Sequence, residues 1–407
     1  MNCKIKMIEE IIKEELVEIY FQPIVSVRTK KIYAFEALTR CTYNGKFIAP
    51  DKLFDLAMQS NLSLELDVLT RNKSIEKFKE YYSKNNDLIL FLNFESSLIN
   101  NFDKNMRNYC FVETIDDVVI PYKNFLIEIK EDEITNTQAL KDFCEYYKEL
   151  GFSIALDDFG TGNSTFDRLN VIKPDLIKID KSLFVDIKNN QINKEIVKAI
   201  AKMSDNLSIQ VLAEGVEDED AICTSMKSNI NLFQGYYFCK PVSELTTVEI
   251  DKILSKTIEI GNLFKERTLN SIAQKRELID YYLGISNKII EQFAKITQIE
   301  KIMFEELSKY KDLEAMYLID VKTSKQINDT IIENSNDRFK PSKEGEEHYL
   351  KEYYYITLES KRGIYMTNNY ISSASGNICK TFARKFDLQS KSYIICLDII
   401  IRENDNK

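Results

Sequence analysis

Histidine is almost absent from this chain of 407 residues, which contains only His348. Chemistry that needs several histidines is therefore excluded, including His-rich zinc sites, histidine-based phosphoesterases and Ser-His-Asp triads. The eight cysteines form no C-x-x-C pair, so the sequence offers neither a zinc ribbon nor a thioredoxin-like motif. We interpret these scattered cysteines as buried, reduced thiols, which predicts a cytoplasmic protein.

Negative charge outnumbers positive charge, and long apolar runs are absent. Lys and Arg number 55 against 64 Asp and Glu, which gives a formal net charge of -9. A general binder of nucleic-acid polymers needs a basic face to displace counterions from phosphates, so we exclude that class, but not a binder of one small anion held through a metal. No run of about 18 apolar residues occurs, so we expect no transmembrane helix. The amphipathic, acidic N-terminus has no signal-peptide core.

Up to about residue 245, short apolar runs alternate with amphipathic segments. The segment 137–150 carries apolar residues at helical spacing. Repeated strand and helix patterns predict a parallel sheet with crossover helices, and eight runs over this length fit a β/α barrel, with an open doubly wound sheet as the alternative. No G-x-G-x-x-G or G-x-x-x-x-G-K motif follows a run, which counts against dinucleotide and P-loop binding. The runs are 20–25, 31–38, 88–94, 125–130, 152–159, 176–180, 208–214 and 232–238.

The rest of the chain reads differently. Apolar residues recur at helical spacing over 247–312, which predicts two or three connecting helices after a first domain of residues 1–246. From 313 to 407, strand-like runs return without helices between them, which predicts a second, smaller α+β domain with an antiparallel sheet. These runs are 315–321, 353–360, 363–372, 378–386 and 392–401.

Acidic and amide residues gather at or near the ends of the first-domain runs. Such residues are often helix N-caps, but their number here favours a common site at the mouth of a barrel. Converging carboxylates repel one another unless a cation lies among them, and oxygen ligands without histidine or thiolate suit Mg²⁺ or Mn²⁺. A metal there polarises a phosphoryl oxygen and activates water, which predicts metal-assisted hydrolysis of a phosphodiester. The residues are Glu36, Asn93, Glu128, Glu131, Asp157, Asp158, Lys178, Asp180, Glu214, Glu217 and Gln234.

Seven short motifs follow one another in order over residues 8–245. E-A-L-x-R stands at 36–40, and Y-x-Q-P-I stands upstream at 20–24. The others are F-L-N at 91–93, D-D-F-G-T-G at 157–162, K-I-D at 178–180, A-E-G-V-E at 213–217, and Q-G-Y at 234–236 with K-P at 240–241. With these motifs, the segment resembles the EAL-domain cyclic di-GMP phosphodiesterases.

The resemblance implies a modified TIM barrel with one antiparallel strand, which hydrolyses cyclic di-GMP to linear pGpG with one or two Mg²⁺ or Mn²⁺ ions. It implies that Lys178 and Glu214 orient and deprotonate water, and that Glu131 anchors a loop that assembles the metal site and a dimer contact. It also implies that Arg40 contacts phosphate and that Gln22, Asp180 and Gln234 serve substrate binding. The implied metal ligands are Glu36, Asn93, Glu128 and Asp157, with Asp158 and Glu217 helping to place a second ion.

One departure from the family lies at 128–131, where E-I-K-E replaces the usual E-x-T-E, so that Lys130 could alter the loop. Since no metal or base position is missing, we expect an enzyme, with two alternatives: a cyclic di-GMP receptor with little turnover, or a metal phosphoesterase of other specificity.

Residues 370–401 are similar to the closing strands of Cache/PAS-like sensor domains, whose ligand the sequence does not reveal. We interpret His348 as an ordinary core or surface residue. The helices at 247–312 are a natural homodimer seam, although an amphipathic helix more often packs on its own domain.

Overall fold

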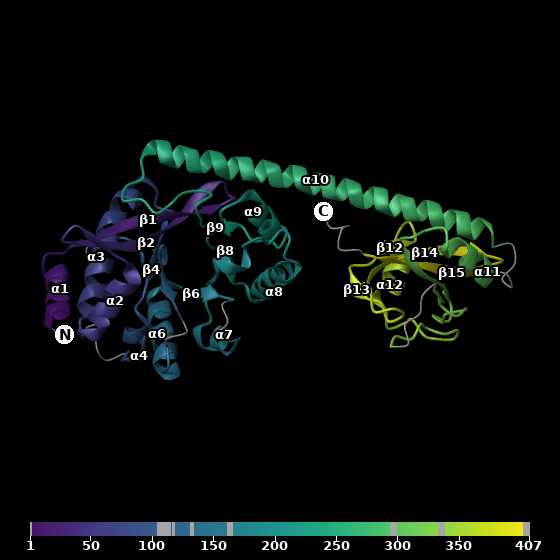
Figure 1. Ribbon diagram of the computed structural model, residues 1–407, viewed down its shortest axis with the longest axis horizontal. Helices are drawn as coiled ribbons and strands as arrows, with labels where there is room; N and C mark the ends of the chain where they lie inside the picture. The colour runs from purple at the N-terminus through teal and green to yellow at the C-terminus, as the bar shows by residue number, and fades with distance from the viewer. Residues whose placement is uncertain are drawn as a thin grey trace. The chain divides into compact units, whose positions relative to one another are not determined.

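The computed structural model describes residues 2–103, 115, 119–130, 134–160, 166–293, 299–332 and 338–401 (Figure 1). The chain divides into two units, Met1–Arg267 and Thr268–Lys407. Helix α10 (Thr247–Glu291) contributes residues to both units. No described helix is long and apolar enough to cross a membrane.

The first unit contains a sheet that closes into a barrel. Strand β1 (Val17–Ser26) pairs with both β2 (Lys31–Tyr43) and β9 (Leu232–Phe233), which joins the two ends of the sheet (Figure 1). Strand β1 is antiparallel to both neighbours, whereas β2 and β4 to β9 are parallel to one another. The predicted barrel with one antiparallel strand is confirmed, and the open-sheet alternative is wrong. The other strands are β3 (Lys46–Ile48), β4 (Ile89–Asn93), β5 (Phe125–Ile129), β6 (Ser153–Phe159), β7 (Leu176–Ile179) and β8 (Gln210–Ala213).

Helices follow the strands and cover the outside of the barrel. The helix predicted over 137–150 is confirmed as α6 (Thr137–Leu150). The side chain of Asn136 accepts a hydrogen bond from the backbone of Ala139 at its start, and Gly151 ends it with a φ of 102°, a backbone conformation that suits glycine. The other helices of this unit are α1 (Asn2–Lys13), α2 (Pro50–Gln59), α3 (Ser63–Lys84), α4 (Ser96–Asn100), α7 (Phe166–Ile172), α8 (Gln191–Leu207) and α9 (Glu219–Met226).

One residue from each barrel strand forms an apolar layer, separate from the larger core that includes residues of the surrounding helices. Since side chains alternate between the two faces of a strand, the residue two positions along from each layer residue faces the same way. The apolar layer therefore fixes which residues lie above it at the mouth. Its members are Ile24, Ala34, Phe91, Leu126, Ala155, Leu176, Leu212 and Leu232.

The first half of α10 packs into the core of the first unit. Ile253, Thr257 and Ile260 are buried at helical spacing, and both isoleucines belong to the large core cluster. The unit consequently extends to Arg267, beyond residue 246 where the sequence suggested its end.

The second unit contains an antiparallel sheet in the order β11-β10-β15-β14-β12, with β13 paired to β14. The predicted antiparallel sheet is confirmed, but the strand predicted over 353–360 is wrong, because α12 (Glu352–Glu359) occupies this segment. Tyr354 and Thr357 are buried three residues apart on one face of that helix, and a short apolar run cannot distinguish the two structures. The elements are α11 (Ile299–Leu307), β10 (Leu313–Asp320), β11 (Ile331–Ile332), β12 (Ile364–Met366), β13 (Tyr370–Ile371), β14 (Ile378–Leu388) and β15 (Lys391–Ile400).

Candidate active site

A ring of eight polar residues lies directly above the apolar layer. Each lies two residues from a member of the apolar layer, on the side of the barrel mouth. In the antiparallel strand β1 the ring residue precedes the layer residue in the chain, and in the other seven strands it follows the layer residue. The strand registers agree, since Gln22 pairs with Glu36 and Asn93 pairs with Glu128. The structure thus brings together most of the residues expected from the sequence. The polar ring consists of Gln22, Glu36, Asn93, Glu128, Asp157, Lys178, Glu214 and Gln234.

The ammonium group of Lys178 lies among the carboxylates of the polar ring. Its Nζ atom lies 2.6 Å from Oε1 of Glu214, 2.7 Å from Oε1 of Glu128 and 3.0 Å from Oδ1 of Asp157. Oε1 of Glu36 is 3.7 Å away. The Lys178 side chain is only 2% exposed, so one ammonium group is surrounded by four carboxylates in a poorly solvated site.

Burial and mutual repulsion change the acidity of these groups. Burial raises the pKa of Glu214 to about 8, helped by Asp157 and Glu36 and opposed by Lys178. Burial, followed by the Glu36 charge, raises the pKa of Glu128 well above its ordinary value. Burial disfavours the charged form of Lys178, yet the carboxylates, Asp157 first, hold its pKa well above the usual range. A single lysine therefore does not compensate the negative charge of the ring.

Amide side chains organise the opposite part of the ring. Asn93 donates a hydrogen bond from Nδ2 to Oε1 of Glu36 at 3.2 Å. Gln234 donates to Oε2 of Glu36 and, at 3.0 Å, to Oε1 of Gln22. Gln22 in turn donates to the backbone carbonyl of Cys239 at 3.1 Å. These contacts orient Glu36 and leave Oε1 of Gln234 buried without a hydrogen bond among the described residues.

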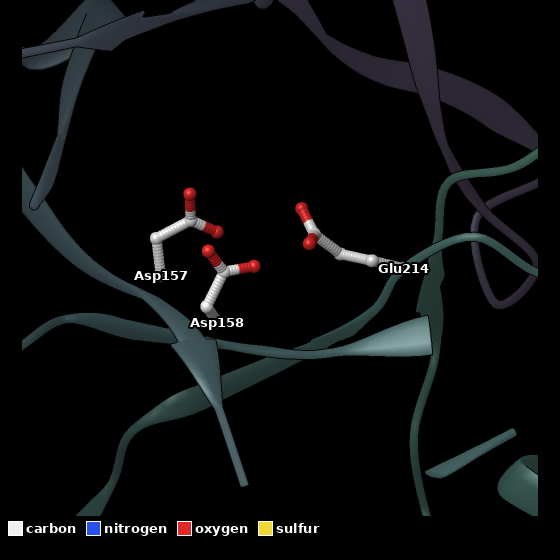
Figure 2. A group of neighbouring side chains, drawn as sticks. All are labelled: Asp157, Asp158 and Glu214. Carbon is white, nitrogen blue, oxygen red and sulfur yellow. The ribbon is translucent and has the colours of Figure 1, made fainter. Parts of the chain in front are cut away.

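Two consecutive carboxylates of β6 face the site. Adjacent strand residues normally point to opposite faces, but the register shifts between Leu156 and Phe159 and Asp158 has a φ of 53°. Figure 2 shows Asp157 and Asp158 side by side, with Glu214 facing them, and their ligand oxygens lie within 4.8 Å of one another.

These residues fit a hard divalent cation. Oε2 of Glu128 is buried and makes no hydrogen bond among the described residues. Oε1 of Glu128 and Oδ1 of Asp157 are also buried, and each is in ion-pair contact with Lys178. Carboxylate and amide oxygens are the donors that Mg²⁺ and Mn²⁺ prefer. Lys130 also approaches the cluster, with Nζ 3.0 Å from Oδ2 of Asp158.

The polar ring opens into a cleft of about 930 Å³. Asp180 and Glu217, both expected from the sequence, line this cleft. Arg40 is not among its lining residues; it donates a hydrogen bond to the backbone carbonyl of Thr39 and lies 5.5 Å from the ring centre of Tyr20. Glu131 lies outside the described residues.

The wall of the cleft contains an ion pair that was not expected from the sequence. Asp67 and Arg71 of α3 line it, form an ion pair and are each 2% exposed. Burial raises the pKa of Asp67 to about 6, opposed by Arg71. The available signal was a pair of opposite charges four residues apart on the apolar face of a helix, since Leu66, Ile75 and Phe78 are buried with them.

His348 in the second unit is a core residue. It is 3% exposed, its Nδ1 lies 2.8 Å from the hydroxyl of Tyr353, and its Nε2 lies 3.0 Å from Oε1 of Gln326. Both ring nitrogens thus have partners, as the interpretation of an ordinary core histidine requires.

Comparisons with known proteins agree with this geometry. The family model of the EAL domain matches residues 5–241. Cyclic di-GMP phosphodiesterase PdeA of Borreliella burgdorferi is 30% identical over 232 residues, which cover 56% of this chain and 34% of that protein. Cyclic di-GMP phosphodiesterase NbdA of Pseudomonas aeruginosa is 25% identical over 248 residues, which cover 59% of this chain and 31% of that protein. The chain thus spans about a third of the length of these two relatives.

A solved structure shares the fold over nearly the whole chain. It is the Bacillus subtilis YkuI protein, which has an EAL domain and is in complex with substrate c-di-GMP and calcium. It is 19% identical, with a TM-score of 0.76 over 97% of this chain and 99% of that one.

Proposed function

The chain belongs to the EAL domain family, and from this premise we propose that it hydrolyses cyclic di-GMP to linear pGpG. The observation that carries the proposal is the buried Lys178, surrounded by Glu36, Glu128, Asp157 and Glu214 at the floor of a cleft. The names of PdeA and NbdA and the bound nucleotide of YkuI support the choice of substrate.

We propose that Mg²⁺ or Mn²⁺ is the cofactor. Glu36, Asn93, Glu128 and Asp157 would hold one ion, and Asp158 and Glu217 would help to hold a second. A bound cation supplies Lewis acidity toward the phosphodiester and makes a nearby water, and the carboxyl groups around it, more acidic. The calcium in the YkuI complex supports a site for a hard divalent cation.

The protein's own residues position the reaction and move its proton. Glu214 accepts the proton of the attacking water at a carboxylate oxygen, and Lys178, 2.6 Å away, keeps that carboxylate in place and stabilises its ionised form. Gln22 and Gln234 fix the orientation of Glu36. The cleft accommodates the nucleotide, with Asp180 in its wall.

Turnover is favoured over a receptor role. Glu214 and every candidate metal ligand are present in the cleft or the ring beneath it, so the described residues give no reason for an inactive site. A receptor with little turnover remains the competing proposal, and the assay below separates the two.

We further propose that the second unit is a Cache/PAS-like sensor that regulates the barrel, and that the protein is a cytoplasmic homodimer. The antiparallel sheet of β10 to β15 supports the sensor assignment. Exposed apolar side chains on α10, including Leu269 and Ile272, support an interface with a second copy. Six cysteines in the described part of the chain are free thiols, as expected in a reducing compartment.

The test is chromatography of the products after incubation with cyclic di-GMP and Mg²⁺ or Mn²⁺. The variant Glu214→Gln should hydrolyse the nucleotide about 10²–10⁴-fold more slowly, because the base is removed. It should retain nucleotide affinity, because the shape of the side chain is kept. The matched control is Glu195→Gln on the exposed face of α8, which should hydrolyse at the wild-type rate. If wild-type protein binds the nucleotide but forms no pGpG, the receptor proposal holds instead.

A further inference from the structure

We propose that Lys256 and Arg267 of helix α10 are positioning residues for the active site. They hold the two loops from which Glu214 and Gln234 project, so the helix shared by both units can act directly on the chemistry. This inference rests on the proposed function for its effect on rate, but the structural coupling can be tested without turnover.

The two loops, 214–218 and 234–238, are interlocked. The backbone N–H of Val216 donates to the carbonyl of Gln234 at 3.1 Å, and the N–H of Tyr237 donates to the carbonyl of Val216 at 3.1 Å. Gly235 lies so close that an added Cβ would be 2.0 Å from the oxygen of Val216. Val216 is completely buried. Neither loop can therefore move without the other, and they carry Glu214 and Gln234 respectively.

Lys256 fastens the interlocked loops to α10. Its Nζ atom donates to the backbone carbonyl of Tyr237 and lies 5.2 Å from the centre of the Tyr237 ring. The hydroxyl of Tyr237 lies 3.4 Å from Oε1 of Glu219, the first residue of α9. Lys256 of α10 thus contacts Tyr237. Tyr237 in turn links the second loop, 234–238, to helix α9, which follows the first loop, 214–218.

Arg267 makes a second attachment eleven residues further along α10. Its Nη1 atom lies 2.5 Å from Oδ1 of Asp220, in the first turn of α9. Lys188 contacts the other oxygen of Asp220 at 2.9 Å. Because α9 begins just after Glu217, Arg267 fixes the helix that ends the first loop, and it does so at the last residue of the first unit.

The attachment lies against a common buried core. Ile253 and Ile260 of α10 are in the same core cluster as Val216 and Phe238 of the two loops. Densely packed interiors transmit displacement instead of absorbing it, so a shift of α10 must be accommodated in the loops or in their attachments. The effect on Glu214 follows, since misplacing a catalytic group by about 1 Å can cost up to about 10²-fold in rate.

The experiment compares Lys256→Met and Arg267→Met with the matched control Lys265→Met, an exposed lysine of the same helix. We expect kcat to fall about tenfold in each of the first two variants, with cyclic di-GMP affinity unchanged within about twofold and the melting temperature retained. Lys256→Arg, which restores a cation and a donor, should recover most of kcat. Amide hydrogen exchange should become faster over 213–218 and 234–238 in both Met variants.

Three results would overturn the proposal: wild-type kcat in both Met variants, an equal loss in Lys265→Met, or unchanged hydrogen exchange in the loops. A loss of kcat with a matching loss of folded protein, not recovered in Lys256→Arg, would reduce Lys256 to a structural role. If the wild-type protein forms no pGpG, the proposed function fails, and hydrogen exchange alone decides whether α10 holds the loops.

Discussion

The ammonium nitrogen of Lys178 lies 2.6 Å from the carboxylate of Glu214, in a site where the lysine side chain is only 2% exposed. Three more carboxylates surround the same nitrogen, so Lys178 stabilises the ionised forms of all four. Without a metal, Lys178 therefore has a structural role, in addition to the catalytic role proposed for it.

Replacing Lys178 with Met should destabilise the metal-free protein. Removing one partner of a buried ion pair leaves unpaired charge and lowers the free energy of unfolding by about 3–5 kcal/mol. Urea unfolding in EDTA measures this loss. Added Mg²⁺ should recover part of it, because a cation then compensates the carboxylates.

The matched control is Lys130→Met, which removes the contact with Asp158. The Lys130 side chain is 52% exposed, and solvent-exposed pairs contribute less than about 1 kcal/mol. If both variants lost the same free energy of unfolding, the proposed structural role of Lys178 would be wrong.

Metal binding should depend on Glu128, whose two carboxylate oxygens are buried and whose Oε2 makes no hydrogen bond among the described residues. We expect Glu128→Gln to bind Mn²⁺ at least about tenfold more weakly in a calorimetric titration, because a charged ligand is replaced by a neutral one. Glu36→Ala should weaken nucleotide binding too.

The choice of ion should affect turnover. Mg²⁺ and Mn²⁺ should support hydrolysis, whereas Ca²⁺ should bind and inhibit, since it takes more ligands in looser geometry. Full activity after treatment with EDTA would refute the metal mechanism.

Gly235→Ala should damage both the fold and the site. Its Cβ would lie 2.0 Å from the backbone oxygen of Val216, which cannot swing away like a flexible side chain. We expect lower thermal stability and loss of turnover, measured by calorimetry and product chromatography. Gly284→Ala is the control, because no atom lies within 4 Å of its added Cβ and it is inside α10, where alanine is favoured over glycine by about 0.5–1 kcal/mol.

His348 should resist protonation. Burial lowers its pKa to about 4, and as the only histidine of the chain it gives an unambiguous NMR titration in tag-free protein. Between pH 6.5 and 4 the unfolded chain binds a proton that the folded protein does not, so this residue makes the folded state less stable as the pH falls through that window. An NMR midpoint near 6.5 would show that the ring is solvated, contrary to the structure.

The extent of α10 decides where the barrel can be cut. A protein truncated after Arg267 should fold and bind cyclic di-GMP, because it keeps Ile253, Thr257 and Ile260 in place. A protein ending at residue 246 exposes the surface that these residues cover, and we expect it to aggregate or melt at a lower temperature. Calorimetry and light scattering make the comparison. Equal stability of the two proteins would place the boundary at 246 after all.

The sequence predicted the barrel and the ring well because both follow from local alternation. Where a strand ends with an apolar residue followed two positions later by a polar residue, the first joins the apolar layer and the second joins the polar ring. Leu126 and Glu128 are one such pair, and Leu176 and Lys178 are another. The family motifs supplied the order of the strands and the roles proposed for these residues.

Other features depend on contacts between distant segments, which local patterns do not encode. The strand predicted over 353–360 is a helix because one of its faces is buried, and the sequence alone cannot show which face will be covered. The Asp67–Arg71 pair and the attachment of Lys256 to Tyr237 depend in the same way on where α3 and α10 pack. Arg40 matches its motif in sequence, yet its side chain contacts Thr39 and Tyr20 instead of lining the cleft.

The apolar layer beneath the polar ring also determines the kinetics that the proposed reaction can have. Its eight residues are at most 6% exposed, so they close the lower end of the barrel to water and ions. Nucleotide, metal and product must then pass through the same opening. A product molecule that is still bound excludes the next substrate, so inhibition by pGpG should be competitive, and its rate of departure sets an upper limit on turnover.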